Sequence, residues 1–163
     1  MSKKEEKTNV MRLLEQKKIP YNSYNYLSTG AISGTEVAKA LDEDPDIVFK
    51  TLVTVGKSKE HYVFVIPVEG ELDLKKAART VGEKSVAMLP VADLLKVTGY
   101  VRGGCSPLGM KKQLGTVIHQ SAVEQHTIVV SGGRIGAQIE LEPQRLAELC
   151  GARFEDIVHQ AGQ

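Results

Sequence analysis

The sequence lacks any long hydrophobic run. Its longest wholly apolar segment, VFVIPV at residues 63–68, is far below the roughly 20 residues that a helix needs to cross a bilayer. The opening segment, MSKKEEKTN, contains no apolar stretch of the kind found in a signal peptide. We therefore expect a soluble protein that is not exported and has no membrane partner.

Cysteine is scarce as well. The chain contains only Cys105 and Cys150, and neither occurs in a CxxC motif or at the cysteine and histidine spacing of a zinc site. Two thiols without an export signal favour a reducing compartment over a disulfide framework. We expect a cytoplasmic location, no bound metal and no cofactor.

An excess of charge of either sign is also absent, because 21 Lys and Arg residues oppose 20 Asp and Glu residues and the net charge is +1. The overall charge therefore does not demand a polyanionic partner, and any nucleic acid must be held by a local patch. No feature indicates DNA binding. A Walker phosphate loop is absent too, since the glycines at 103–109 do not have the GxxxxGK[ST] spacing.

The patterns that are present predict one α+β domain, residues 1–163, with a mixed, largely antiparallel sheet and surrounding helices. Apolar runs at 48–55 and 61–68, joined by the polar GKSKE, predict a central hairpin. Further strands are expected at 21–27, 116–120, 127–133 and 137–141. Helices are expected within 8–20, 34–41, 72–82, 90–99 and 142–151.

The segment RGGCSPLGMKK at 102–112 is a candidate site. Cys105 paired with a histidine would be a nucleophile, but no spacing connects it to one, and a small hydrophobic residue in a loop explains it as well. Gly103 and Gly104 can adopt positive φ and let a ligand approach backbone N–H groups. The alternative is an ordinary structural turn.

Lys50 interrupts an apolar strand face. In VFKTLV, alternation places it on the same face as Val48 and Leu52. A buried ammonium is costly unless it is paired. A lysine that lines a pocket for an anionic or polar ligand would account for this position, as would an edge strand from which the side chain reaches water.

Four segments carry a resemblance to a known family: VFKTL at 48–52, LDLKKAA at 72–78, TGYVRGGCSPLG at 98–109, and VSGG followed by GAQIEL within 130–141. Together they resemble the YbaK family of aminoacyl-tRNA deacylases over nearly the whole chain. The resemblance implies an α+β fold related to the editing insertion of prolyl-tRNA synthetase. It also implies hydrolysis, in trans, of the ester that joins a wrong amino acid, chiefly cysteine, to proline tRNA, and it suggests prolyl-tRNA synthetase as a partner.

The resemblance assigns roles to individual residues. Lys50 would be the essential lysine, and Gly104 would present its backbone to the ester. The other substrate-binding residues would be Tyr26, Thr51, Gly103, Ser106, Pro107, Gly109, Ser131 and Gly132. Contacts with the tRNA acceptor stem would fall to Arg102, Lys111, Lys112 and Arg134. A second basic patch would comprise Lys75, Lys76 and Arg79, for which a solvated helix face is the alternative.

Two positions bear on the mechanism that the resemblance implies. Position 105 varies in the family, which argues against Cys105 as a nucleophile, and the implied route uses the thiol of the bound cysteinyl group instead. Where some members carry an aspartate, this chain has Gln138, which cannot act as a general base. Gln138 favours the alternative of a non-catalytic module that binds aminoacyl-tRNA or a synthetase.

Overall fold

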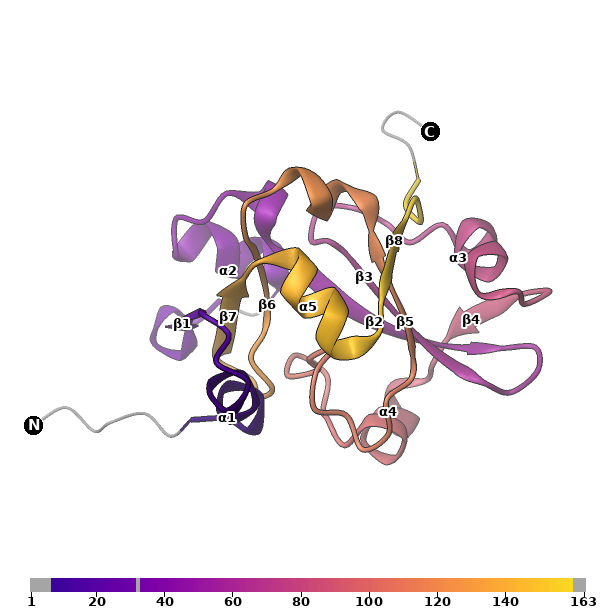
Figure 1. Cartoon of the computed structure of the whole chain (residues 1–163), viewed down its shortest axis with the longest axis horizontal. Coiled ribbons are helices and arrows are strands. Elements are labelled where there is room, and N and C mark those ends of the chain that lie inside the picture. The colour runs from indigo at the N-terminus through magenta and orange to yellow at the C-terminus, as the bar shows by residue number, and fades with distance from the viewer. Residues whose placement is uncertain (1–6, 32, 160–163) are drawn as a thin grey trace, which may run out of the picture.

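The predicted hairpin lies in the interior of the larger of two sheets (Figure 1). The computed structural model describes residues 7–31 and 33–159, so the ends of the expected domain lie outside the described residues. The larger sheet has the order β4-β2-β3-β5-β8. Its strands are β2 (Phe49–Gly56), β3 (His61–Pro67), β4 (Val86–Met88), β5 (Gly115–His119) and β8 (Arg153–Glu155). β2 is antiparallel to β3 and β4, whereas β5 is parallel to β3 and β8, so the sheet is mixed.

The other strands form an antiparallel sheet of order β1-β7-β6. They are β1 (Asn22–Asn25), β6 (Ile128–Ser131) and β7 (Ala137–Leu141). The two sheets meet at a parallel bridge between Val48 and Val129. The α+β class is therefore confirmed, but the strands are divided between two sheets. β4 and β8 were not predicted, because strands of three residues carry almost no periodic signal.

The predicted helices are present. They are α1 (Asn9–Gln16), α2 (Gly34–Ala40), α3 (Leu74–Val81), α4 (Val91–Thr98) and α5 (Pro143–Cys150), with 3-10 turns η1 (Leu27–Thr29), η2 (Pro45–Ile47) and η3 (Gln120–Glu124). The Thr8 hydroxyl accepts the N–H of Met11, and the Asp73 carboxylate accepts two N–H groups of α3. Pro90 is the N-cap residue of α4. No helix in the described part is long and apolar enough to cross a membrane.

One apolar core joins the two sheets. Phe49 and Val53 of β2 pack in it together with Val130 of β6 and Ile139 of β7. α5 lies across the junction of the sheets in Figure 1, and its Leu146 is fully buried in the same core. Burial of one aliphatic side chain of this size contributes about 1.5–3 kcal/mol. The shared core therefore holds the two sheets together and fixes the junction at which the candidate site lies.

Candidate functional site

Lys50 lies where the two sheets separate. β2 contacts β6 at the Val48–Val129 bridge and pairs with β4 from Thr54 onward, and between these points no described strand flanks β2 on that side. Lys50 is half-buried on a face whose neighbours, Val48 and Leu52, pack in apolar clusters. Across the described chain, its ammonium has no ion-pair or hydrogen-bond partner. An unpaired ammonium in this position favours a ligand site over a purely structural role.

Ser131 and Lys50 follow the bridged pair Val129 and Val48 by the same number of residues, on strands that belong to different sheets. Gly132 comes next, and its N–H donates to the Ala137 carbonyl (2.8 Å), which closes the turn between β6 and β7. On the opposite face of β2, the Thr51 hydroxyl is buried without a partner among the described residues. Such a group costs about 1–3 kcal/mol. Thr51 shares its face with the core residues Phe49 and Val53, so its contact with the substrate stays a prediction.

The glycine loop packs against the turn between β6 and β7. A Cβ atom at Gly104 would lie 2.9–3.0 Å from backbone atoms of Arg134 and Ile135, so this close approach requires glycine. Gly103 has a left-handed φ of 87°. Tyr26, which is 8% exposed, donates its hydroxyl to the Gly103 carbonyl (3.3 Å). Three segments that are distant in the sequence are thus brought together beside the junction of the sheets.

The N–H of Gly104 is engaged within the loop. It donates to the Val101 carbonyl (3.0 Å), so it is not free for the contact with the ester that we expected of it. The next two amides, those of Cys105 and Ser106, have no acceptor in the described structure, although both residues are buried. Buried N–H groups are rarely left unpaired. Because Ser106 is fully buried, the Cys105 amide is the better candidate for binding an oxyanion, and Gly104 is the residue that allows the loop to approach the turn.

The side chains of the loop are enclosed. Ser106 is fully buried, and its hydroxyl accepts the N–H of Leu108 (3.3 Å), while Pro107 is also buried. Burial raises the pKa of the Cys105 thiol to about 11. A thiol with such a pKa is almost entirely un-ionised at neutral pH and is a poor nucleophile. The geometry therefore disfavours a cysteine-dependent hydrolase.

Gln138, which departs from the family pattern, is buried on β7 beside a carboxyl group that the sequence analysis missed. With its amide nitrogen turned toward Glu43, Gln138 lies 2.9 and 3.3 Å from the two carboxylate oxygens. Burial raises the pKa of Glu43 to about 7; the bond from Gln138 opposes this rise, and the charge of Glu140 adds to it. No local pattern connects Glu43 to β7, because only the fold brings them together. A group that titrates near neutral pH therefore lies beside position 138.

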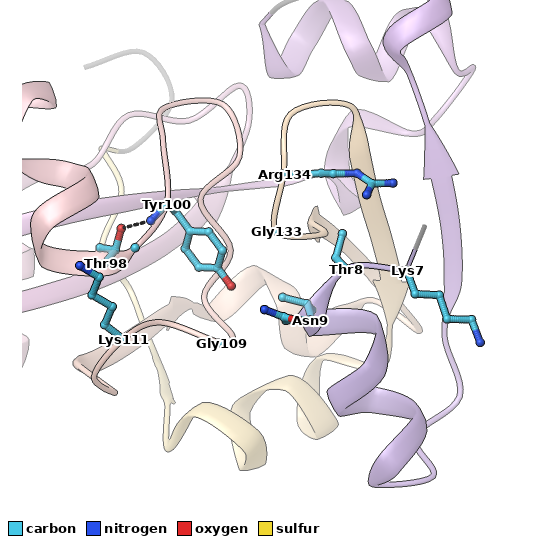
Figure 2. A pocket seen from close by; sticks show the side chains of 11 residues that line it. Lys7, Thr8, Asn9, Thr98, Tyr100, Gly109, Lys111, Gly133 and Arg134 are labelled. Carbon is cyan, nitrogen blue, oxygen red and sulfur yellow. Dashed lines mark hydrogen bonds between the residues drawn. The ribbon is translucent and has the colours of Figure 1, made fainter. Parts of the chain in front are cut away.

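A cleft of about 450 Å³ opens beside the glycine loop, between the start of α1, the segment 98–111 and the turn at Gly133 (Figure 2). It is lined by Lys7, Thr8, Asn9, Val10, Thr98, Gly99, Tyr100, Gly109, Lys111, Gly133 and Arg134. Lys50 does not line it. Lys7 and Tyr100 were not among the predicted site residues, because no motif or periodic pattern in the sequence marks them.

The cleft divides the predicted tRNA contacts. Lys111 and Arg134 line it together with Gly109, one of the predicted substrate-binding residues. Arg102 and Lys112 are exposed but lie outside the lining. Two of the four predicted tRNA-binding residues therefore line the cleft, and the other two lie outside it.

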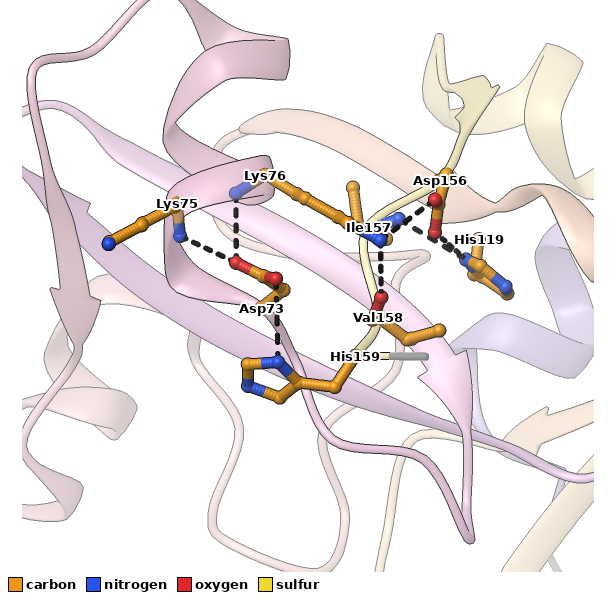
Figure 3. Close-up of polar contacts among 8 residues, drawn as sticks. All are labelled: Asp73, Lys75, Lys76, His119, Asp156, Ile157, Val158 and His159. Atoms are coloured by element: carbon orange, nitrogen blue, oxygen red, sulfur yellow. Dashed lines mark hydrogen bonds and ion pairs between the residues drawn. The ribbon is translucent and has the colours of Figure 1, made fainter. Parts of the chain in front are cut away.

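The second basic patch includes a residue with a structural role. Lys76 donates to the Asp156 carboxylate and to the Val158 carbonyl, both at 2.9 Å (Figure 3). This contact is the main cause that lowers the pKa of Asp156. Lys76 therefore anchors the segment after β8, and its contact with tRNA stays a prediction. Lys75 and Arg79 are exposed on α3.

Comparisons with known proteins show the family of the chain. A family model described as an aminoacyl-tRNA editing domain matches residues 31–149. EbsC of Enterococcus faecalis (strain ATCC 700802 / V583), described as a candidate Cys-tRNA(Pro)/Cys-tRNA(Cys) deacylase, is 46% identical over 156 residues, which is 95% of each chain. A solved structure described as a candidate trans-editing enzyme for prolyl-tRNA synthetase has a TM-score of 0.80 and 25% identity, with 93% of this chain and 95% of that chain covered. The hypothetical protein APE2540 has a TM-score of 0.85 at 21% identity, with 93% and 100% covered, and shows the fold alone.

Proposed function

Because the chain belongs to the aminoacyl-tRNA editing domain family, we propose that it hydrolyses the ester bond of mischarged aminoacyl-tRNA in trans, chiefly that of Cys-tRNA(Pro). The description of its relative EbsC, a candidate Cys-tRNA(Pro)/Cys-tRNA(Cys) deacylase, supports this substrate. The observation in this chain that carries the proposal is Lys50, a half-buried lysine without a counter-charge in the described structure, at the junction of the two sheets.

The nucleophile in this proposal is the thiol of the substrate. Burial raises the pKa of both cysteine thiols of the protein, Cys105 and Cys150, to about 11. His119 is also a poor candidate for a base, because its Nδ1 accepts the N–H of Ile157 (3.3 Å) and burial lowers its pKa. The sulfur of the cysteinyl group attacks its own carbonyl carbon and forms a cyclic thioester. The ester C–O bond breaks, and the thiol proton passes to the ribose oxygen of the released tRNA. Water then opens the cyclic thioester and gives free cysteine.

The protein contributes position and electrostatic stabilisation. The unpaired amide of Cys105 would bind the developing oxyanion, and one such donor is worth about 3 kcal/mol. Lys50 would hold a hydroxyl or phosphate of the terminal adenosine of the tRNA, and Tyr26 would contact the same adenosine. Holding the reacting groups close together supplies several kcal/mol more. None of these contributions requires a carboxylate at position 138.

A deacylation assay with labelled Cys-tRNA(Pro) tests the proposal. The wild-type protein is expected to release cysteine with multiple turnover, and Lys50→Ala is expected to be at least about tenfold slower, a barrier change of about 1.4 kcal/mol. Lys57→Ala, at an exposed lysine of the β2–β3 turn, is the matched control and is expected to retain wild-type turnover. Far-UV circular dichroism and thermal melting establish that each variant is folded.

The same assay separates the second candidate function, a non-catalytic module that binds aminoacyl-tRNA. Saturable binding of Cys-tRNA(Pro) by the wild-type protein without release of cysteine would favour the module. Wild-type turnover in folded Lys50→Ala would remove Lys50 from the site. The partner and the location follow from the substrate. We propose that the protein acts in the cytoplasm, where tRNA is charged, on tRNA supplied by prolyl-tRNA synthetase.

A further inference from the structure

Two large apolar side chains are exposed beside the glycine loop. Leu27 is 61% exposed and Ile135 is 50% exposed. Leu27 begins η1 directly after Tyr26, and Ile135 lies in the turn between β6 and β7. Single exposed aliphatic side chains are common on protein surfaces, so the contacts of these two decide whether they form a site.

Both side chains lie against glycines of the candidate site. A Cβ atom at Gly136 would collide with the Leu27 side chain, and a Cβ atom at Gly103 would lie 3.5 Å from Cγ1 of Ile135. Gly136 also has a left-handed φ of 96°, which disfavours any side chain there. Gly136 follows Ile135 directly in the chain. The absence of a side chain at Gly136 therefore lets Leu27 lie against the turn that carries Ile135.

Tyr26 fixes these two side chains relative to the glycine loop. Its N–H donates to the Gly136 carbonyl (2.9 Å), and its hydroxyl donates to the Gly103 carbonyl (3.3 Å). One residue therefore connects the start of η1, the turn between β6 and β7, and the glycine loop. Leu27 and Ile135, which we call the Leu27–Ile135 surface, thus border the candidate editing site directly.

The charge around the Leu27–Ile135 surface suits a nucleotide. The three segments that meet here, residues 26–31, 99–112 and 131–137, together contain lysine and arginine but no aspartate or glutamate. A nucleotide offers an apolar base face and a negative phosphate. Sites for single-stranded RNA accordingly combine a surface that covers the base with positive charge nearby. An apolar surface without acidic neighbours meets both requirements.

We infer that the Leu27–Ile135 surface packs against the adenine base of the terminal adenosine of the tRNA. The inference rests on the proposed function, because that function brings the aminoacyl ester to the glycine loop. The adenine is attached to the same ribose as the ester, so it must lie close to the loop when the ester is bound there. Lys50 and Tyr26 are proposed to contact this adenosine, and the Leu27–Ile135 surface adds the contact that reads its base.

Calorimetric titration with an amide analogue of the substrate tests this inference. In 3′-deoxy-3′-(cysteinylamino)adenosine an amide replaces the ester, and a second ligand carries the same cysteinylamino ribose without the base. The double variant Leu27→Ala/Ile135→Ala is expected to raise the Kd of the adenosine analogue at least about tenfold, because the base loses its apolar contact. The same variant is expected to change the Kd of the base-free ligand by less than about twofold.

The matched control is Leu74→Ala/Val123→Ala, which removes two exposed aliphatic side chains from α3 and η3. The control is expected to change the Kd of the adenosine analogue by less than about twofold. Far-UV circular dichroism and thermal melting establish that both double variants are folded. An equal loss on the two ligands, an equal loss in the two double variants, or an unchanged Kd for the adenosine analogue would overturn the inference. Failure of the wild-type protein to bind the analogue would overturn it as well.

The binding experiment requires no hydrolysis, so it separates this inference from the proposed function. Base-dependent binding that the double variant loses, without release of cysteine from Cys-tRNA(Pro), would contradict the proposed function and leave the inference standing. Equal kcat/KM for cysteinyl-adenosine and its base-free ester would support the proposed function and overturn the inference.

A second copy of the chain is the other occupant that the variants address. Sedimentation of the wild-type protein as a dimer and of Leu27→Ala/Ile135→Ala as a monomer, with an unchanged Kd for the adenosine analogue, would assign the surface to self-association and overturn the inference.

Discussion

Replacement of Glu43 by glutamine should change the pH dependence of stability. Glu43 lies beside Gln138, and its pKa is raised from 4.5 to about 7, chiefly by burial and further by the charge of Glu140. A raised carboxyl pKa means that the folded state keeps a proton that the unfolded state has lost. The protonated form therefore contributes its full stabilisation below pH 4.5, and this stabilisation is lost as the pH rises to about 7.

The size of the effect follows from the same pair of values. The interval between 4.5 and about 7 corresponds to about 3 kcal/mol at 1.36 kcal/mol per pH unit. Because part of the Glu43 side chain reaches solvent, screening reduces this figure to about 1–2 kcal/mol. Glutamine has nearly the shape of the protonated acid and carries no charge. Glu43→Gln is therefore expected to match the wild type near pH 4 and to be about 1–2 kcal/mol more stable near pH 8.

Urea denaturation of both proteins across this pH range measures the difference directly. Other titrating groups cancel in it, because they are common to the two proteins. Glu69→Gln is the matched control. Glu69 is exposed, and it lines a second cavity together with Glu43, Thr35 and Lys39. The control is expected to show a difference that does not vary with pH. A difference between Glu43→Gln and the wild type that is equally independent of pH would refute the reasoning.

Two further predictions concern the glycine loop. Gly104→Ala places a methyl group against the backbone of Arg134 and Ile135, so we expect the free energy of unfolding in urea to fall by about 1–3 kcal/mol and deacylation to fall at least about tenfold. Gly70→Ala, where a Cβ atom has ordinary contacts, is the control. An unchanged free energy of unfolding in Gly104→Ala would show that the loop moves freely. Cys105→Ala is expected to deacylate Cys-tRNA(Pro) at close to the wild-type rate and to be far slower on seryl-tRNA, which has no thiol. Similar rates on the two esters would show that water, and not the substrate thiol, is the nucleophile.

The sequence alone determined the features that depend on neighbouring residues. The helix ranges, the hairpin at 48–68 and the alternation that places Lys50 on an apolar face were all predicted, because helix and strand periodicity depend on a few consecutive residues. The family was also recognisable, since its segments occur in the right order along the chain. Predictions that rest on local pattern are therefore the reliable part of the sequence analysis.

Only the tertiary structure decided which distant residues share a site. It divided the strands between two sheets and left Lys50 at their junction, and it engaged the Gly104 N–H within the loop. It also placed Glu43 against Gln138 and brought Lys7 to the same cleft as Lys111. No periodicity or motif relates the members of these pairs, because their contacts depend on how whole elements pack around the shared core. Whether a charged group finds a partner or is left unpaired is likewise decided by that packing.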